Sequence, residues 1–149
     1  MKKIIILSLF LFSCTSHGRE DCDVFTNPVS CIGGPRDEVG FDGFTLQERQ
    51  GDTVYLSFPE ANPIDLNVEV NIIDNKIFRI RYALTSARGT ASMQQFQEFK
   101  DEIKALFPQN KWRSAESRDG LVEIYEDVGI KVALFRYSVI MYDPRLAIK

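Results

Sequence analysis

Apolar and polar residues alternate strictly along residues 66–72, where the even positions are apolar and the odd positions are polar. Side chains of a strand alternate between its two faces, so this stretch predicts a β-strand with one buried face. An Asp-Asn pair follows as a tight turn, and the alternation returns over residues 76–84. In this hairpin Arg79 and Arg81 lie on the polar face, where each can pair with Glu69 on the opposite strand.

Shorter runs of the same kind predict further strands on both sides of one helix. Residues 44–49 and 53–58 flank a turn, and residues 121–128 and 130–142 follow later in the chain. Over residues 90–108 the apolar period becomes that of a helix with one apolar side, and the proline at its end stops the helix. The expected order is β-β-β-β-α-β-β. This order predicts an α+β domain in which an antiparallel sheet of about six strands packs on one helix.

A different pattern stands at the beginning of the chain. Lys2 and Lys3 precede an apolar run over residues 4–12, and Ser13 precedes Cys14. A basic segment, an apolar run and a small residue before the cleavage site are the parts of a secretory signal. The run is about half as long as the roughly 20 residues that a membrane-spanning helix needs. We therefore expect export and cleavage after residue 13; a buried N-terminal strand or helix is the alternative.

The residues at the expected cleavage site, Leu-Phe-Ser-Cys over 11–14, resemble the bacterial lipobox, whose cysteine receives diacylglycerol. The resemblance covers only the signal, and by it the chain is similar to bacterial lipoproteins. It implies a mature protein that begins at Cys14 and is held at a bilayer by several acyl chains, since one chain alone binds only marginally. Because Thr15 is not the Asp that retains many such proteins at the inner membrane, the resemblance implies the outer membrane, facing the periplasm. Cleavage without lipidation is the alternative.

With Cys14 assigned to lipid, two cysteines remain, Cys22 and Cys31. In an oxidising compartment this pair favours a disulfide, which across so short a loop contributes about 2–3 kcal/mol in the chain-entropy model. A metal site is the alternative, although two thiolates without further Cys or His ligands make a poor one. We expect residues 14–43 to form a lipidated tether and a disulfide-pinned loop, and residues 44–149 to form one domain.

Composition and charge limit the partners and the chemistry. The net charge is −3, and removal of Lys2 and Lys3 makes it more negative, which argues against nucleic acid or anionic lipid as the main partner. Apolar and charged fractions of 44% and 26% are those of an ordinary globular protein. The single histidine, His17, lies in the expected tether, so a Ser-His-Asp or Cys-His system is not expected in the folded part. No motif for a cofactor or a metal stands out.

Two alternatives to a binding protein remain open. One is a cell-wall or glycan-acting enzyme that uses Glu123, Glu126 and Asp127, but solvated strand charges explain these carboxylates more simply. The other is a carrier for a small ligand or lipid, with a pocket between helix and sheet that a filled core would replace. Its lining would be aromatic: Tyr82, Phe96 and Phe99.

The last expected strand, residues 130–142, is largely apolar on both faces, whereas a single helix covers only one face of a sheet. Either a loop covers the second face, or that face binds another protein. The leading hypothesis is a non-catalytic, membrane-anchored protein-binding domain, as an accessory subunit of an envelope assembly or as an immunity protein against a toxin. The candidate partner-binding residues are aromatic or basic: Arg79, Arg81, Trp112, Tyr125, Phe135 and Tyr137.

Overall fold

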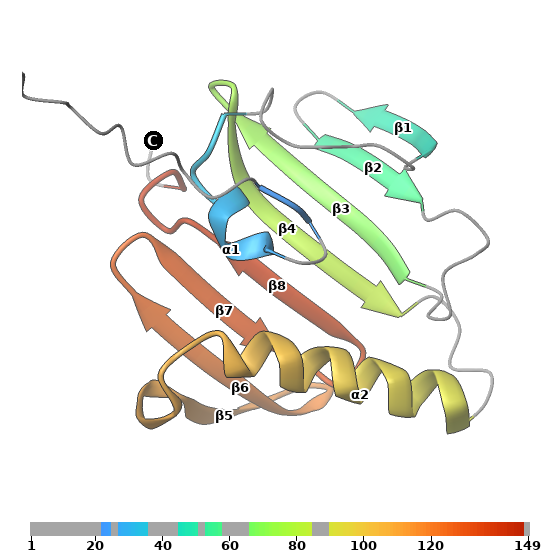
Figure 1. Ribbon diagram of the computed structural model, residues 1–149, viewed down its shortest axis with the longest axis vertical. Helices are drawn as coiled ribbons and strands as arrows, with labels where there is room; N and C mark the ends of the chain where they lie inside the picture. The colour runs from blue at the N-terminus through green and yellow to red at the C-terminus, as the bar shows by residue number, and fades with distance from the viewer. Residues whose placement is uncertain are drawn as a thin grey trace, which may run out of the picture.

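The fold is known from a computed structural model of the chain (Figure 1). The predictions that concern residues 1–21, among them the signal and Cys14, lie outside the described residues. For strands β1 and β2 the structure describes the backbone only. The described residues are 22–24, 27–35, 45–50, 53–57, 66–84 and 90–147.

The described strands form one antiparallel sheet of eight strands, in the order β1-β2-β3-β4-β8-β7-β6-β5. The first four strands and the last four each form a consecutive meander, and the two meanders join where β4 pairs with β8. The strands are β1 (Thr45–Gln50), β2 (Thr53–Ser57), β3 (Leu66–Ile73), β4 (Lys76–Leu84), β5 (Arg113–Ser117), β6 (Gly120–Asp127), β7 (Ile130–Leu134) and β8 (Ser138–Tyr142).

In the described part of the chain, three helical segments accompany the sheet: α1 (Pro28–Cys31), α2 (Thr90–Ala105) and the 3-10 turn η2 (Gln109–Lys111). The prediction of an α+β fold with an antiparallel sheet is confirmed, and the long helix lies where its period placed it. The expected order β-β-β-β-α-β-β was wrong in two respects. A short helix precedes the strands, and four strands instead of two follow α2.

The first additional strand, β5, comes from a polar segment that the sequence presents as a loop. Its residues Arg-Ser-Ala-Glu-Ser have no apolar alternation, and none of them is buried. They form a strand because they pair with β6, and β5 is the edge strand of the sheet. An edge strand with charged side chains is one way in which proteins discourage further strand pairing. Hydrophobic pattern therefore could not identify it.

The second additional strand arises because the chain turns at residues 135–137, within the segment expected to be a single strand. The turn contains no Gly, Pro, Asn or Asp, so it has no sequence signal. The backbone N–H of Phe135 donates to the carbonyl of Ser138 at 2.8 Å, which closes the hairpin. Val132 then pairs with Met141 and Leu134 with Val139.

This turn explains why residues 130–142 are apolar at both odd and even positions. Even-numbered residues of β7 and odd-numbered residues of β8 point to the same side of the sheet, and all four side chains named above are buried. The two-sided apolar strand was an artefact of reading two strands as one. The apolar pattern of residues 130–142 is therefore no evidence for an exposed binding face.

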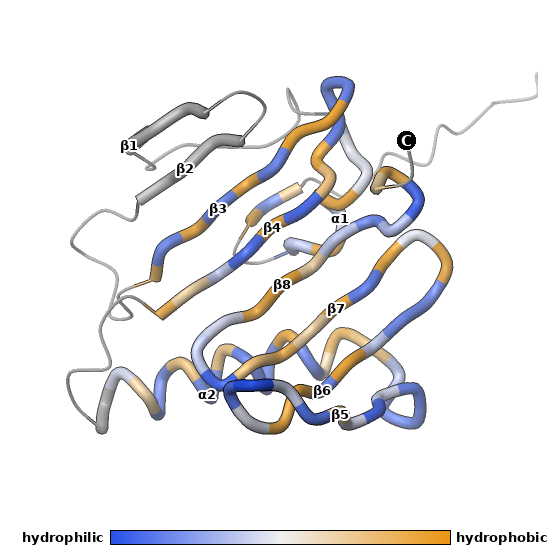
Figure 2. The backbone as a smooth tube through the Cα atoms, turned by 180° about the vertical axis from the view of Figure 1, so that it is seen from behind, coloured by the Kyte–Doolittle hydropathy of each residue, from blue (hydrophilic) through white to orange (hydrophobic). Residues whose placement is uncertain are grey.

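The core lies between the sheet and the two α-helices, which cover the same face (Figure 1). Tyr82 of β4 and Phe96 of α2 are completely buried, and Phe99 meets the Tyr82 ring edge to face with centroids 5.1 Å apart. Seen from behind, the opposite face of the sheet is not covered by any helix of the described part (Figure 2). We call it the open face.

The predicted disulfide between Cys22 and Cys31 is present, and it closes a loop within the segment that contains α1. Cys31 is completely buried, and the hydroxyl of Tyr82 donates to the carbonyl of Val24. The backbone N–H of Gly33 donates to the carbonyl of Ile77 at 2.8 Å, and the N–H of Ile77 donates to the carbonyl of Gly34. The stapled loop is thus packed on the start and the middle of β4.

Candidate functional site

The six predicted partner-binding residues lie in three separate places. Arg79 and Arg81 project from β4 onto the open face, because their neighbours at 80 and 82 are in the core. Trp112 directly follows η2, and Tyr125 lies on the helix-covered face of β6. Both belong to an aromatic cluster with Phe107. The other two, Phe135 and Tyr137, belong to the turn between β7 and β8.

On the open face, the strand register aligns one residue from each of six adjacent strands. The two ends of this row are charged, and its middle is apolar. The sequence pattern alone does not reveal this row, because the row depends on strand order and on the turn at residues 135–137. We call it the central row; from β5 to β3 it consists of Arg113, Ile124, Ala133, Ile140, Arg81 and Glu69.

A second row lies beside the first, two residues farther along each strand. It has a lysine and an arginine on either side of a tyrosine whose ring meets Phe78 edge to face with centroids 6.0 Å apart. From β6 to β3 this second row consists of Glu126, Lys131, Tyr142, Arg79 and Asn71.

At the β4 end of the rows, two arginines share one carboxylate. Arg79 pairs with Glu69 at 2.5 Å between Nη2 and Oε1, and its Nε donates to Asn71 at 2.8 Å. Arg81 lies 3.6 Å from the other oxygen of Glu69. The predicted pairing across this hairpin is confirmed. Since the side chain of Arg81 is 44% exposed and that of Glu69 only 16%, the guanidinium is the group presented to solvent.

The β5 end of the rows repeats the arrangement with different residues. Arg113 and Lys131 both pair with one oxygen of Glu126, at 3.0 and 3.5 Å. The side chain of Arg113 is 63% exposed. We call these two groups the β4 cluster (Glu69, Arg79, Arg81) and the β5 cluster (Arg113, Glu126, Lys131).

The two clusters together have a charge opposite in sign to that of the whole chain. Each cluster has two cations and one carboxylate, so together they contribute a charge of +2, whereas the chain has a net charge of −3. Four strand intervals separate Arg113 from Arg81, which at about 4.8 Å each places their backbones about 19 Å apart. Half-buried Ile124 and Ile140 lie between them. The open face therefore combines an apolar centre with two basic flanks.

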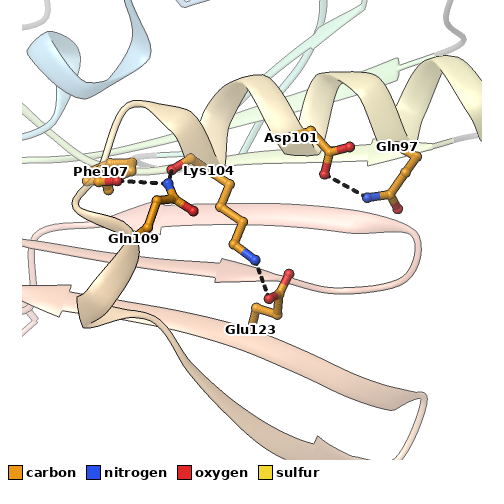
Figure 3. Close-up of polar contacts among 6 residues, drawn as sticks. All are labelled: Gln97, Asp101, Lys104, Phe107, Gln109 and Glu123. Carbon is orange, nitrogen blue, oxygen red and sulfur yellow. Dashed lines mark hydrogen bonds and ion pairs between the residues drawn. The ribbon is translucent and has the colours of Figure 1, made fainter.

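A groove of about 530 Å³ lies on the other side of the sheet, between α2 and the ends of β5, β6 and β7. Leu134 and Phe135 contribute apolar wall, and Lys100 and Arg136 contribute positive charge. Glu123 also lines the groove, but Lys104 pairs with it at 2.5 Å (Figure 3). Partial burial lowers the pKa of Lys100, although Asp101 and Glu123 oppose that shift.

Charges of both signs line this groove: Lys100 and Arg136 are positive, and Asp101, Asp119 and Glu123 are negative. Asp101 accepts a hydrogen bond at 2.9 Å from Gln97, one turn earlier on α2 (Figure 3). Of the six predicted residues only Phe135 reaches the groove. The groove is therefore a cavity whose lining does not favour a ligand of one charge, in contrast to the open face.

The aromatic cluster beside the groove is packed against the core. Phe107 and Tyr125 have ring centroids 4.5 Å apart, and Trp112 lies 5.6 Å from Tyr125. Lys104 lies 5.7 Å above the Trp112 ring, whose buried Nε1 has no hydrogen-bond partner among the described residues. Tyr125 is only 4% exposed, so these two predicted residues close the edge of the core and are not presented as a flat binding surface.

The three carboxylates considered for catalysis do not converge. Glu123 lies on the helix-covered face with Lys104, whereas Glu126 lies on the open face in the β5 cluster. Hydrogen bonds from Lys111, from the backbone N–H of Val128 and from Tyr125 lower the pKa of Asp127 to about 2. A general acid needs the opposite shift, toward neutral pH.

Tyr82, Phe96 and Phe99, which were expected to line a carrier pocket, pack against one another and fill the space between helix and sheet. In the described part of the chain, no group of three or more Cys, His, Asp or Glu side chains is placed to hold a metal ion. Nor do the described helices include one that is long and apolar enough to span a membrane.

Comparisons of the chain with models of protein families, with curated proteins and with solved structures found no match. Its function is therefore argued from the open face, the groove and the N-terminal segment.

Proposed function

We propose that this chain is a lipoprotein of the bacterial envelope, anchored by lipid on Cys14 and facing the periplasm, whose domain binds another protein without catalysis. The observation that carries the binding role is the open face. No described helix covers it (Figure 2), and its apolar centre lies between two clusters that each have a net positive charge. A toxin-immunity protein and an accessory subunit of an envelope assembly would both use such a surface.

The chemistry of the open face suits protein recognition. Arginine is enriched at interfaces, where its planar group offers several donors to a carboxylate partner. Sharing one carboxylate between two cations holds the cations in place and leaves each cluster with a net positive charge. Because neighbouring strands hold both clusters, the surface is rigid before binding, which reduces the entropy lost on association.

The anchor is supported by the sequence of the first residues. A basic start, an apolar run and a lipobox-like Leu-Phe-Ser-Cys precede the described domain. With the anchor in place, the outer membrane would hold the domain near partners in the periplasm.

A pulldown from detergent-solubilised envelopes tests the binding role. The full chain is compared with Arg81→Gln/Arg113→Gln, which removes one cation from each cluster. Arg118→Gln/Arg136→Gln is the matched control, because it makes the same change of charge outside the open face. We expect a stoichiometric protein with the unmodified chain and with the control, and its loss with the open-face variant. Loss with the control variant alone would place the interface at the groove, and recovery of lipid alone would contradict protein binding.

A small-ligand carrier is the second candidate, and the groove of about 530 Å³ is the observation in its favour. Small-molecule sites commonly enclose roughly 300–1,000 Å³. Its mixed charges give no reason to prefer one ligand class, so we rank it below protein binding. The enzyme alternative remains testable by alanine at Glu123, Glu126 and Asp127 together, which would abolish a carboxylate-dependent activity.

A further inference from the structure

We propose that the open face binds an acidic amphipathic α-helix of the partner protein, lying along β7 and β8. Its apolar side would rest on Ile124, Ala133 and Ile140, and carboxylates on its two flanks would meet the β4 and β5 clusters. This inference rests on the proposed function and names the element that the surface receives.

The width of the apolar centre fits one helix. Ile124 and Ile140 lie two strand intervals apart, which is about 10 Å. A helix with its side chains is about 10–12 Å across, so one helix and not two spans this centre. Arg81 lies one interval beyond the centre on one side, and Arg113 lies one interval beyond it on the other. Glu or Asp on both flanks of the helix would therefore reach a cation on each side.

The spacing of the two rows also fits a helix that runs along the strands. The rows are two residues apart, which is about 6.7 Å along a strand. Side chains four residues apart on a helix are about 6 Å apart along its axis. One flank with carboxylates at i and i+4 would then face Arg81 and Arg79 of β4, and a carboxylate on the other flank would face Arg113 of β5.

Charge selects this occupant over a lipid surface. Membrane-binding basic segments typically carry 4–8 Lys or Arg residues without compensation, whereas here two of the four cations are balanced by Glu69 and Glu126. The large apolar side chains that are most exposed in the described part lie outside the two rows: Leu106, Leu121, Val128 and Tyr137. Insertion into a bilayer would need such side chains on the open face.

A second copy of the chain meeting face to face is also disfavoured, because the β4 and β5 clusters of both copies have the same net positive charge. A partner sheet laid on the open face would place apolar side chains over the clusters as well as over the centre. A helix places apolar groups only on the centre, which is where the surface offers them.

Site-directed photo-crosslinking in the full chain tests the inference. A photoreactive residue replaces Ile140, at the middle of the central row, and a second preparation carries it at Leu121, which is 71% exposed on the helix-covered side. Crosslinking is done in intact envelopes, and mass spectrometry identifies the segment joined to position 140. We expect a helical segment with Asp or Glu on both flanks, and no joined protein at position 121.

The joined segment is then synthesised, and its affinity for the purified chain is measured at two salt concentrations. We expect Arg81→Gln/Arg113→Gln to weaken binding about tenfold or more at low salt, and Arg118→Gln/Arg136→Gln to leave it unchanged. Circular dichroism of the bound segment should show helix.

The possible results separate the inference from the proposed function. A joined segment that is extended, or that lacks acidic flanks, overturns the helix and leaves protein binding at the open face intact. Failure to join any protein at position 140 overturns both. Vesicles of phosphatidylglycerol and phosphatidylethanolamine provide the remaining arm: if they bind the non-lipidated chain, and Arg81→Gln/Arg113→Gln abolishes that binding, the open face recognises lipid and the inference is wrong.

Discussion

Tyr82 connects the stapled N-terminal segment to the sheet, and its removal tests how that segment is held. Its side chain is completely buried, and its hydroxyl donates to the carbonyl of Val24, a residue that is only 1% exposed. Tyr82→Phe keeps the ring and its contact with Phe99 but leaves the buried carbonyl without this donor. A buried polar group that loses its partner costs about 1–3 kcal/mol, so we expect the free energy of unfolding to fall by that amount.

Urea unfolding followed by circular dichroism measures the effect. Tyr137→Phe is the matched control, because Tyr137 is 41% exposed and its change is expected to stay within about 0.5 kcal/mol. Repeating Tyr82→Phe in a chain that also carries Cys22→Ser and Cys31→Ser gives a double-mutant cycle.

If the disulfide holds Val24 against Tyr82, the cost of Tyr82→Phe should shrink by about 1 kcal/mol when the disulfide is absent, because the carbonyl can then reach water. Equal costs with and without the disulfide would show that the staple and the hydroxyl act independently. A cost of Tyr82→Phe no larger than that of the control would refute the reasoning as a whole.

Three further predictions concern other parts of the molecule. Burial, with a smaller effect of Asp23, raises the pKa of Tyr82 well above its usual 10.0, so the folded state favours the protonated phenol. The free energy of unfolding should therefore fall as the pH rises above about 10, and it should fall less steeply in Tyr82→Phe. Urea midpoints between about pH 8 and 11.5 measure this. Gly129→Ala should destabilise the fold by about 1–3 kcal/mol in urea unfolding, because Gly129 has a φ of 81° and an added Cβ would lie 2.6 Å from Nη2 of Arg145. Val128→Ala in the same turn is the control, and an equal effect of the two substitutions would contradict this reason. Intact mass of the membrane fraction should show acyl chains on an N-terminal Cys14, and an unmodified Cys14 would leave only an exported protein.

The parts of the fold that depend on neighbouring residues could be predicted from the sequence. Residues 66–84 have the alternation of a hairpin with a turn between its strands, and the contact between Glu69 and Arg79 follows from that pairing alone. The period of α2 is similarly local, because the apolar side of a helix recurs every three or four residues. The disulfide followed from counting cysteines once Cys14 was assigned to lipid.

The parts that depend on distant strands could not be predicted. The turn at residues 135–137 has backbone hydrogen bonds within the hairpin and from Leu84 of β4, and no residue type marks it. The polar strand β5 exists because β6 offers it a partner. The central row needs both of these features, since Arg113 joins it through β5 and Ile140 joins it only after the turn. Arg81 could therefore be proposed as a binding residue, whereas its counterpart Arg113 could not.

The seam between β4 and β8 has a consequence for how the chain acquires its fold. β8, the last of the described strands along the chain, inserts between β4, which is completed some 50 residues earlier, and β7. Until β8 arrives, the first meander has an unpaired edge and its apolar face lacks Met141 and Val139. A chain that emerges N-terminus first, from a ribosome or through a translocation channel, thus cannot close its sheet until the final strand has come through. Loss of the last dozen residues would leave two half-sheets with no strand between them.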